Sequence, residues 1–166
     1  MRLVLVRHAE AVLLGTYGAE SDAERMLTFT GRATANALAA FLASRGWTCD
    51  ALVCSTLVRA RETALPLLAC TNPRPNEPLE WGDLEPDTFK PKKTAERIAE
   101  LNAKTVAVVG HNPNLNRWAE WLLGTPAIEF DKGAAACFRC RGGPSEGQAT
   151  LEWYLPPEFY VPVTSS

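Results

Sequence analysis

The stretch TVAVVGHNP, residues 105–113, decides the fold of this chain. Its first five residues form a continuous β-branched and apolar run, which is typical of a strand buried on both faces of a sheet. Pro113 is tolerated in the first turn of a helix, and Gly124 can end that helix. The stretch therefore predicts a buried strand that is followed, after Gly110 and His111, by a helix.

Other segments have the composition of strands. Residues 2–6 and 51–54 are short apolar runs, so we expect both to lie inside a parallel sheet. Residues 79–81 indicate a short edge strand. Residues 135–141 and 150–155 flank a turn rich in Gly, Pro and Ser, and they predict a C-terminal β-hairpin.

Helical patterns alternate with these strands. Thr30 is a candidate cap for a helix that ends at Gly46, and further helices are predicted over about 57–70 and 93–101. The tail from Pro156 onwards is proline-rich and is expected to be irregular. Strand and helix alternation predicts an α/β fold of three layers, α/β/α, in which helices cover both faces of a mostly parallel sheet.

Composition limits the class of protein. The chain has 166 residues, which suggests a single domain, with 46% hydrophobic and 22% charged residues. These values count against collagen-like, coiled-coil and disordered chains. Seventeen basic and nineteen acidic residues give a formal net charge of -2, so a nucleic-acid partner is not expected. The oligomeric state stays open.

The sequence also indicates a cellular location and a role for the cysteines. The N-terminal apolar run is too short for the core of a signal peptide, and no segment approaches the roughly 20 apolar residues of a membrane span. We therefore expect a cytoplasmic protein with no membrane partner. Five cysteines, an odd number, do not suggest a disulfide framework. Cys137 and Cys140 have the CxxC spacing of a redox pair or half a zinc site, but no second ligand pair accompanies them, so we expect buried structural thiols.

Basic and imidazole side chains follow three of the predicted strands. Arg7 and His8 follow the first strand, His111 follows the strand of the opening stretch, and Arg59 and Arg61 come after the second. In open α/β sheets, ligands bind beyond the carboxyl ends of the strands. We therefore expect these groups to gather at one edge of the sheet.

A cluster of arginines and histidines suits a phosphoryl group. Arginine stays charged and binds phosphate oxygens through two parallel hydrogen bonds. Histidine can accept a phosphoryl group on a ring nitrogen and pass it to water. Because arginines can stabilise the transition-state charge, we expect no metal and no cofactor. Arg61 lies two positions beyond Arg59 on the same helix, so it should point elsewhere.

Four segments resemble, in order, the signature motifs of the histidine phosphatase superfamily, which includes phosphoglycerate mutase. They are VRHAEA at 6–11, with Ala9 in place of the usual glycine of the RHG signature, RMLTFTGR at 25–32, STLVRARETA at 55–64 and VGHN at 109–112. Order and spacing match from Arg2 to about Gly124. The resemblance implies a phosphoglycerate mutase-like fold and one histidine phosphatase domain over residues 1–166.

The resemblance also implies a role for each site residue. His8 is the nucleophile that carries the phosphoryl group, while Arg7, Arg59 and His111 form the phosphate pocket. His111 is expected to be charged or to donate a hydrogen bond to the transferred group. Because His8 must attack with a free ring nitrogen, its other ring nitrogen should donate to a backbone carbonyl.

The general acid is where the sequence departs from the family. Many members place a glutamate two residues after a leucine in the central segment, and here Pro86 stands there, after Leu84. Glu85 and Asp87 are candidate substitutes, although either could be a solvated loop carboxylate. An acid matters less for a phosphoramidate, because its P–N bond is labile and the imidazole can leave already protonated. The departure and the short chain resemble the SixA-type branch, whose members are protein phosphohistidine phosphatases.

Three functions remain open. The leading hypothesis is a phosphatase that acts on protein phosphohistidine through a phospho-His8 intermediate. The alternatives are a phosphatase for a small phosphate ester, such as a sugar or nucleotide phosphate, and a non-catalytic phosphate-binding module. A mutase is disfavoured, because it must retain its product and the chain has little sequence for an enclosing cap.

Overall fold

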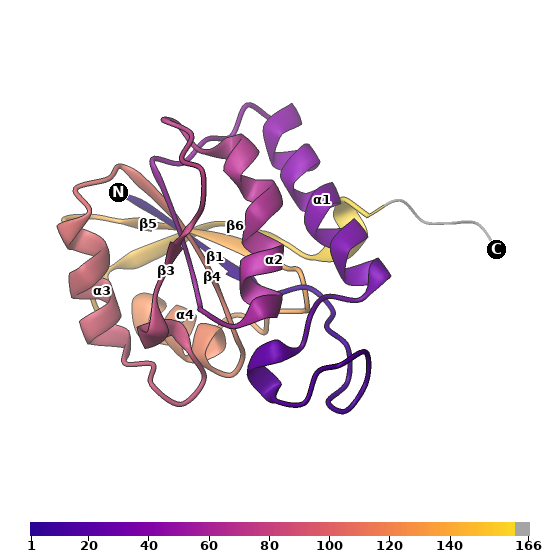
Figure 1. Ribbon diagram of the computed structural model, residues 1–166. Coiled ribbons are helices and arrows are strands. Elements are labelled where there is room, and N and C mark those ends of the chain that lie inside the picture. The colour runs from indigo at the N-terminus through magenta and orange to yellow at the C-terminus, as the bar shows by residue number, and fades with distance from the viewer. Residues whose placement is uncertain (162–166) are drawn as a thin grey trace.

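Strand β4 (Thr105–Gly110) lies inside a six-stranded sheet, between β1 (Arg2–Arg7) and β2 (Ala51–Cys54). The structure is a computed structural model that describes residues 1–161. The strand order is β3-β2-β4-β1-β5-β6, with β3 (Leu79–Glu80) and β6 (Ala149–Leu155) at the edges (Figure 1). The first four strands are parallel, whereas β5 (Ala135–Cys140) is antiparallel to both β1 and β6. The predicted mostly parallel sheet with a C-terminal hairpin is confirmed.

Within residues 1–161, four α-helices cover the two faces of this sheet: α1 (Phe29–Ser44), α2 (Val58–Leu67), α3 (Pro91–Glu100) and α4 (Asn114–Leu123). Helices α1 and α2 lie side by side over one face (Figure 1), where Leu38 shares a core with Val4. Helices α3 and α4 cover the opposite face, where Trp118 shares a second core with Leu5. The three-layer α/β/α arrangement predicted from the sequence is confirmed.

The apolar runs of the central strands have a simple cause. Leu3 and Leu5 of β1 belong to one core, and Val4 and Val6 belong to the other. All four side chains are at most 1% exposed. Because successive side chains of a strand point to opposite faces, a strand covered by helices on both sides needs apolar residues at every position.

The start of α1 differs from the prediction. The helix begins at Phe29, and its cap is Thr28, whose Oγ1 accepts the Gly31 N–H at 2.9 Å. The expectation that Thr30 caps the helix is wrong, because Thr30 already lies in the first turn. Thr28 has the extended backbone that a capping residue needs, with φ -66° and ψ 171°.

Four 3₁₀ helices complete the described chain: η1 (Asp22–Glu24), η2 (Leu68–Cys70), η3 (Gly82–Leu84) and η4 (Pro157–Phe159). The last one corrects the expectation of an irregular tail, and the hydroxyl of the neighbouring Tyr160 donates to Gly133 O at 2.7 Å. The rest of the predicted tail, 162–166, lies outside the described residues. In residues 1–161, no helix has the length and apolar character needed to cross a membrane.

The CxxC pair is divided by the sheet. Cys137 and Cys140 are both buried in β5, but Cys137 belongs to the core under α1 and α2, and Cys140 belongs to the core under α3 and α4. Their sulfurs therefore lie on opposite faces of the sheet, which excludes a shared disulfide or zinc ion. Burial raises the pKa of the Cys137 thiol to about 12 and that of Cys140 to about 11. These are structural thiols, as expected.

Candidate active site

The two histidines meet at the carboxyl ends of β1 and β4. These strands pair in parallel with Arg7 opposite Gly110, so His8 and His111 leave the sheet at the same level. The His8 N–H donates to Gly110 O at 3.0 Å, and the two imidazole ring centroids are 5.0 Å apart. The structure thus brings together the two imidazoles that the sequence placed at strand ends.

The ring of His8 is oriented by its own loop. His8 Nδ1 lies 2.7 Å from Ala9 O. Because a carbonyl oxygen can only accept, Nδ1 carries the proton and Nε2 keeps its lone pair. The Ala9 N–H donates in turn to Thr63 Oγ1 at 3.1 Å, and that hydroxyl donates to Arg59 O at 2.7 Å. One buried threonine therefore links the His8 loop to the helix that carries Arg59.

Close packing against α1 fixes the same loop. Ala9 is fully buried and packs with Leu27 and Ala35. A Cβ added at Gly31 would lie only 2.0 Å from Glu10 O, so glycine is needed where the helix meets the loop. This contact gives a physical reason for the glycine of the segment RMLTFTGR.

Both arginines of the predicted phosphate pocket are held by their terminal nitrogens. Arg7 Nη1 donates to Phe130 O at 2.7 Å. Arg59 is 4% exposed and donates from Nη1 to Asp22 O at 2.6 Å and from Nη2 to Asp22 Oδ2 at 2.8 Å. The Nε of each arginine is buried without a hydrogen-bond partner among the described residues. Buried donors of this kind are normally satisfied, so both Nε–H groups are suited to an oxyanion.

His111 adds two more buried nitrogens to the pocket. Its side chain is 2% exposed, and neither ring nitrogen has a hydrogen-bond partner within residues 1–161. Its backbone carbonyl accepts the N–H of Leu115 in the first turn of α4, which places the residue between strand and helix. One N–H and one lone pair of this ring are therefore available to a bound group.

Burial and positive charge keep both imidazoles neutral. The pKa of His8 is lowered to about 4, chiefly by burial and to a smaller extent by the nearby guanidiniums of Arg59 and Arg7, against the opposing effect of the Ala9 carbonyl. Burial also lowers the pKa of His111 to about 3, with smaller contributions from His8 and Arg59. Of the two states expected for His111, the neutral donating one fits this pocket.

The two candidate acids are placed differently. Glu85 is half-buried, and its Oε1 accepts a hydrogen bond of 2.5 Å from Thr56 Oγ1, just beyond the end of β2. Asp87 is exposed, and its side chain forms neither a hydrogen bond nor an ion pair with the described residues. Of the two, only Glu85 therefore hydrogen-bonds to the segment between β2 and α2, which leads to Arg59.

Arg61 points away from the pocket, as expected. Its Nη2 lies 3.3 Å from Glu77 Oε1, and its Nε lies 2.8 Å from Glu80 Oε1. Its side chain is 40% exposed, in contrast to the buried Arg59. Arg59 of this helix therefore lies buried beside the histidines, whereas Arg61 forms ion pairs near the surface.

Asp22 and Arg25 also belong to the surroundings of the pocket, and neither was predicted from the sequence. Asp22 binds Arg59 across 37 positions of sequence, and Arg25 Nη1 binds Asp22 Oδ1 at 2.8 Å. Both residues lie in a polar stretch without periodicity, so Asp22 gave no signal of its own. Arg25 lies in a segment with a family resemblance, and this was the one available hint.

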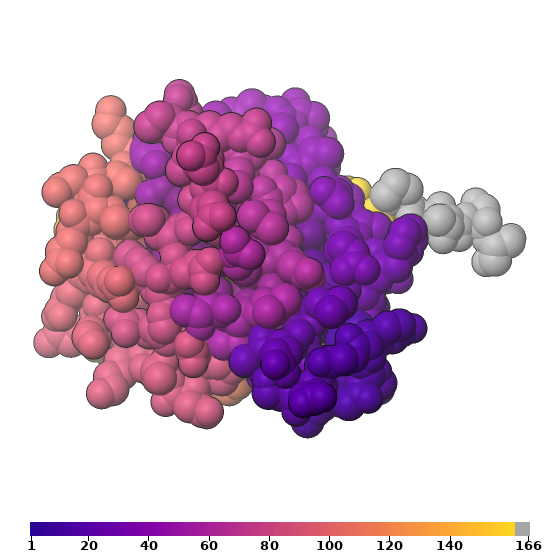
Figure 2. Space-filling model, in the orientation of Figure 1, coloured from indigo at the N-terminus to yellow at the C-terminus, as the bar shows by residue number. Residues whose placement is uncertain are grey.

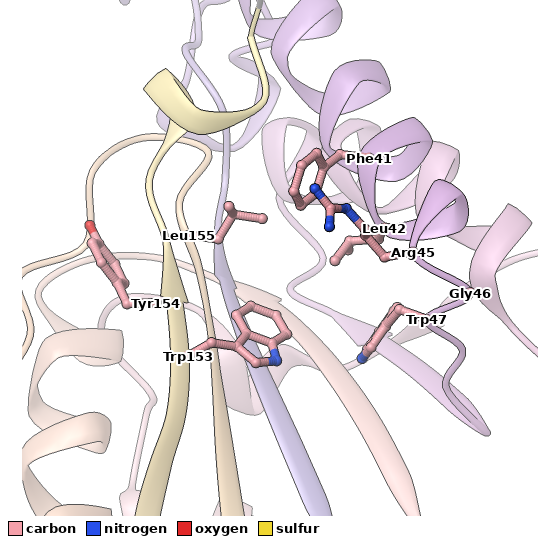
Figure 3. A pocket seen from close by; sticks show the side chains of 8 residues that line it. All are labelled: Phe41, Leu42, Arg45, Gly46, Trp47, Trp153, Tyr154 and Leu155. Atoms are coloured by element: carbon pink, nitrogen blue, oxygen red, sulfur yellow. The ribbon is translucent and has the colours of Figure 1, made fainter.

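A cavity away from the two histidines opens on another side of the sheet. It has a volume of about 520 Å³ between the end of α1 and β6, and Phe41, Arg45, Trp47 and Trp153 are among its lining residues (Figure 3). None of the predicted site residues lines it. In the part of the chain that the structure describes, no group of three or more His, Cys, Asp or Glu side chains could hold a metal ion.

A mostly parallel sheet covered by helices, with imidazoles and guanidiniums gathered beyond its strand ends, is an arrangement suited to phosphoryl groups. Residues 3–85 match the histidine phosphatase superfamily (branch 1), and the chain belongs to that superfamily. The superfamily is named for its phosphatase members. A comparison with curated protein sequences found no match.

Solved structures with the same fold include several phosphatases. The protein histidine phosphatase SixA complexed with tungstate matches with a TM-score of 0.80 and 23% identity, over 96% of this chain and 99% of its own. A putative phosphohistidine phosphatase SixA from Agrobacterium tumefaciens matches with a TM-score of 0.77 and 24% identity, over 94% and 97%. A putative alpha-ribazole-5'-P phosphatase from Escherichia coli has a TM-score of 0.71 and 20% identity, over 99% of both chains. These likenesses confirm the phosphoglycerate mutase-like fold.

Proposed function

We propose that this chain is a metal-independent phosphatase that removes phosphate from protein phosphohistidine and carries the phosphoryl group on His8. The observation that supports this most is the 2.7 Å contact between His8 Nδ1 and Ala9 O. It leaves the Nε2 lone pair free for attack, and the pKa of about 4 keeps the ring neutral at neutral pH.

The reaction proceeds in two displacements. His8 Nε2 attacks phosphorus while the bond from phosphorus to the substrate imidazole nitrogen breaks, and that nitrogen takes the bonding electron pair. A proton already on the other substrate ring nitrogen lets the imidazole leave as a neutral ring. Water then attacks phosphorus, releases a proton to solvent and breaks the Nε2–P bond, which restores neutral His8 and yields inorganic phosphate.

The pocket nitrogens would hold the phosphoryl oxygens. The Nε–H groups of Arg7 and Arg59 are buried without partners among residues 1–161, as is the ring N–H of His111. In a site that excludes water, such fixed donors stabilise the charge on the transferred group more strongly than they would in solution. Both arginines lie near enough to His8 and His111 for their charges to lower the pKa of each imidazole, which supports a role in catalysis rather than in passive phosphate binding alone.

Two features favour a phosphohistidine substrate. Neither Glu85 nor Asp87 hydrogen-bonds to a pocket residue within the described chain, and the imidazole of phosphohistidine needs no acid to leave. Residues 81–90 alone connect β3 to α3, which leaves little chain to enclose a small molecule. The similar structures named for SixA, described as histidine or phosphohistidine phosphatases, agree with this choice.

A small phosphate ester is the second candidate substrate. Thr56, in the segment that follows β2, donates a hydrogen bond to Glu85, and a protonated carboxyl group there could give its proton to an alkoxide leaving group. The similar structures also include a phosphoserine phosphatase from Entamoeba histolytica. This candidate predicts that Glu85→Gln lowers ester turnover, whereas Asp87→Asn has little effect.

The deciding experiment compares kcat/KM on a phosphohistidine protein with kcat/KM on a panel of sugar, nucleotide and aryl phosphates. We expect a preference for the phosphohistidine protein and an acid-labile phosphoenzyme in wild-type protein. His8→Ala should lower activity by about 1000-fold or more and abolish the phosphoenzyme. Arg61→Gln, which alters an arginine outside the pocket, is the matched control. Full activity in His8→Ala would refute the mechanism, and a steep ester preference would refute the substrate.

A further inference from the structure

The short helix η1 reaches the pocket through one residue. Asp22 binds the guanidinium of Arg59 twice, with its backbone oxygen on Nη1 at 2.6 Å and its Oδ2 on Nη2 at 2.8 Å. Figure 2 shows the N-terminal loop, in indigo, lying against the magenta surface that includes α2. A residue far from Arg59 in sequence therefore contacts both terminal nitrogens of its side chain.

Asp22 is itself held in place. Its Oδ1 accepts from Arg25 Nη1 at 2.8 Å, and Arg25 Nε donates to Val12 O at 2.7 Å. At the start of η1, Glu24 Oε2 accepts the backbone N–H of Ser21 at 2.9 Å. These contacts fix both the backbone and the side chain that face Arg59.

The remaining edge of Arg59 is the one suited to a ligand. Its Nε is buried without a partner in the described chain, while both terminal nitrogens are already engaged. Arg7 repeats this arrangement, with Nη1 on Phe130 O and Nε buried without a partner among the same residues. In both arginines, an oxygen from a loop holds the far end of the guanidinium and leaves the Nε–H for another acceptor.

We propose that Asp22 is a positioning residue, which orients Arg59 so that its Nε–H faces the phosphoryl group and which balances its buried charge while the pocket is empty. The proposal rests on the proposed function, because it assigns Arg59 to phosphoryl binding. A buried guanidinium without a counter-ion is costly, and a long side chain without anchors loses its orientation. Asp22 supplies both the charge and the anchor.

Two other roles for Asp22 give different expectations. A general acid needs a proton, but hydrogen bonds from Arg25 and Arg59 lower the pKa of the Asp22 carboxyl despite the opposing effect of partial burial. Asp22 is therefore ionised at neutral pH. A carboxylate that merely competes with phosphate for Arg59 would weaken anion binding, so its removal would strengthen binding.

Calorimetric titration with inorganic phosphate and with tungstate separates these roles. We expect Asp22→Ala to weaken the binding of both anions by about 10- to 100-fold, because a misplaced guanidinium loses its directed hydrogen bonds. Asp22→Asn should restore part of the loss, since its amide oxygen can still accept from Arg59 Nη2. Glu20→Gln removes a carboxylate from an exposed residue of the same loop and should leave binding unchanged.

Thermal unfolding of each variant checks that the fold is intact. If Asp22→Ala does not fold, Asp22→Asn alone carries the test, with a smaller expected loss. Unchanged or tighter anion binding in the folded Asp22 variants would overturn the positioning role. A wild-type protein that binds tungstate, loses it in Asp22→Ala and yet hydrolyses no phosphohistidine would refute the proposed function while supporting the role of Asp22.

Discussion

The imidazole rings of His8 and His111 lie with their centroids 5.0 Å apart and their planes inclined by 53°. Both rings are neutral at neutral pH, because burial lowers their pKa values to about 4 and about 3. The positive charge available to an anion therefore comes from the pocket arginines, while the imidazoles supply a lone pair and an N–H. Since a bound dianion would favour the protonated rings, ligand binding and protonation are coupled in this site.

The acid limb of the pH–rate profile should lie well below the ordinary histidine value. His8 attacks in its neutral form, which exists above its pKa, so activity is lost as the pH falls through about 4 and not through 6.5. We expect kcat/KM for an aryl phosphate, corrected for ionisation of the substrate, to stay nearly constant from pH 7 to pH 5. A loss of corrected kcat/KM near pH 6.5, caused by titration of the enzyme and not of the substrate, would contradict the lowered pKa of His8.

Folding stability should fall on acidification for the same reason. The folded pKa values of His8 and His111 lie below the unfolded value of 6.5, so the unfolded chain binds more protons from about pH 6.5 down to about pH 4 for His8 and about pH 3 for His111. The free energy of unfolding is therefore unaffected by titration of these two histidines above pH 6.5, and it decreases as the pH falls through this window. The loss is at most about 1.4 kcal/mol for each unit of pKa difference at each histidine.

Urea unfolding of wild-type protein and of a His8→Asn, His111→Asn double variant measures this effect. The free energy of unfolding should depend less steeply on pH in the double variant, because asparagine does not titrate. Acidic side chains titrate in both proteins, so the difference between the two slopes isolates the histidines. Equal slopes between pH 6.5 and pH 4 would contradict the lowered pKa values of His8 and His111.

Replacing the two threonines at the start of α1 tests the observed cap. Thr28→Ala should lower the free energy of unfolding by about 1 kcal/mol, because the Gly31 N–H loses its acceptor and Glu10 loses the hydroxyl that binds it at 2.8 Å. Thr30→Ala should change it by only a few tenths of a kcal/mol, since the side chain is exposed in the first turn. Equal losses in thermal or urea unfolding would reject Thr28 as the cap.

That pair of threonines also shows where prediction from sequence reaches its limit. The layers of the fold follow from the apolar runs, because a strand covered on both faces must be apolar at every position. The helix boundary does not follow, because Thr28 and Thr30 have the same capping chemistry. Only the extended backbone at Thr28 distinguishes them, and it comes with a long-range contact, because the Thr28 N–H donates to the Glu10 carbonyl against which Gly31 packs.

Some residues of the candidate site could likewise be predicted from the sequence, and others could not. His8 and His111 could be placed together, because each directly follows a strand and parallel strands end at one edge of the sheet. Asp22 could not, because its contact with Arg59 depends on how a loop without periodicity folds back. The different surroundings of Glu85 and Asp87 could not be predicted either, because only the folded loop makes Glu85 half-buried against Thr56 and leaves Asp87 exposed.

The hydroxyl of Thr63 should matter for both stability and activity. It is 1% exposed, accepts the Ala9 N–H and donates to Arg59 O, so it joins the loop of the nucleophile to α2. Thr63→Val keeps the shape but leaves a buried N–H unpaired, and it should lower the free energy of unfolding by about 1–3 kcal/mol. Activity should fall as well, because Ala9 O orients the ring of His8. Thr63→Ser keeps the hydroxyl and should retain most activity; equal kcat/KM in the Val and Ser variants would show that this link does not position the nucleophile.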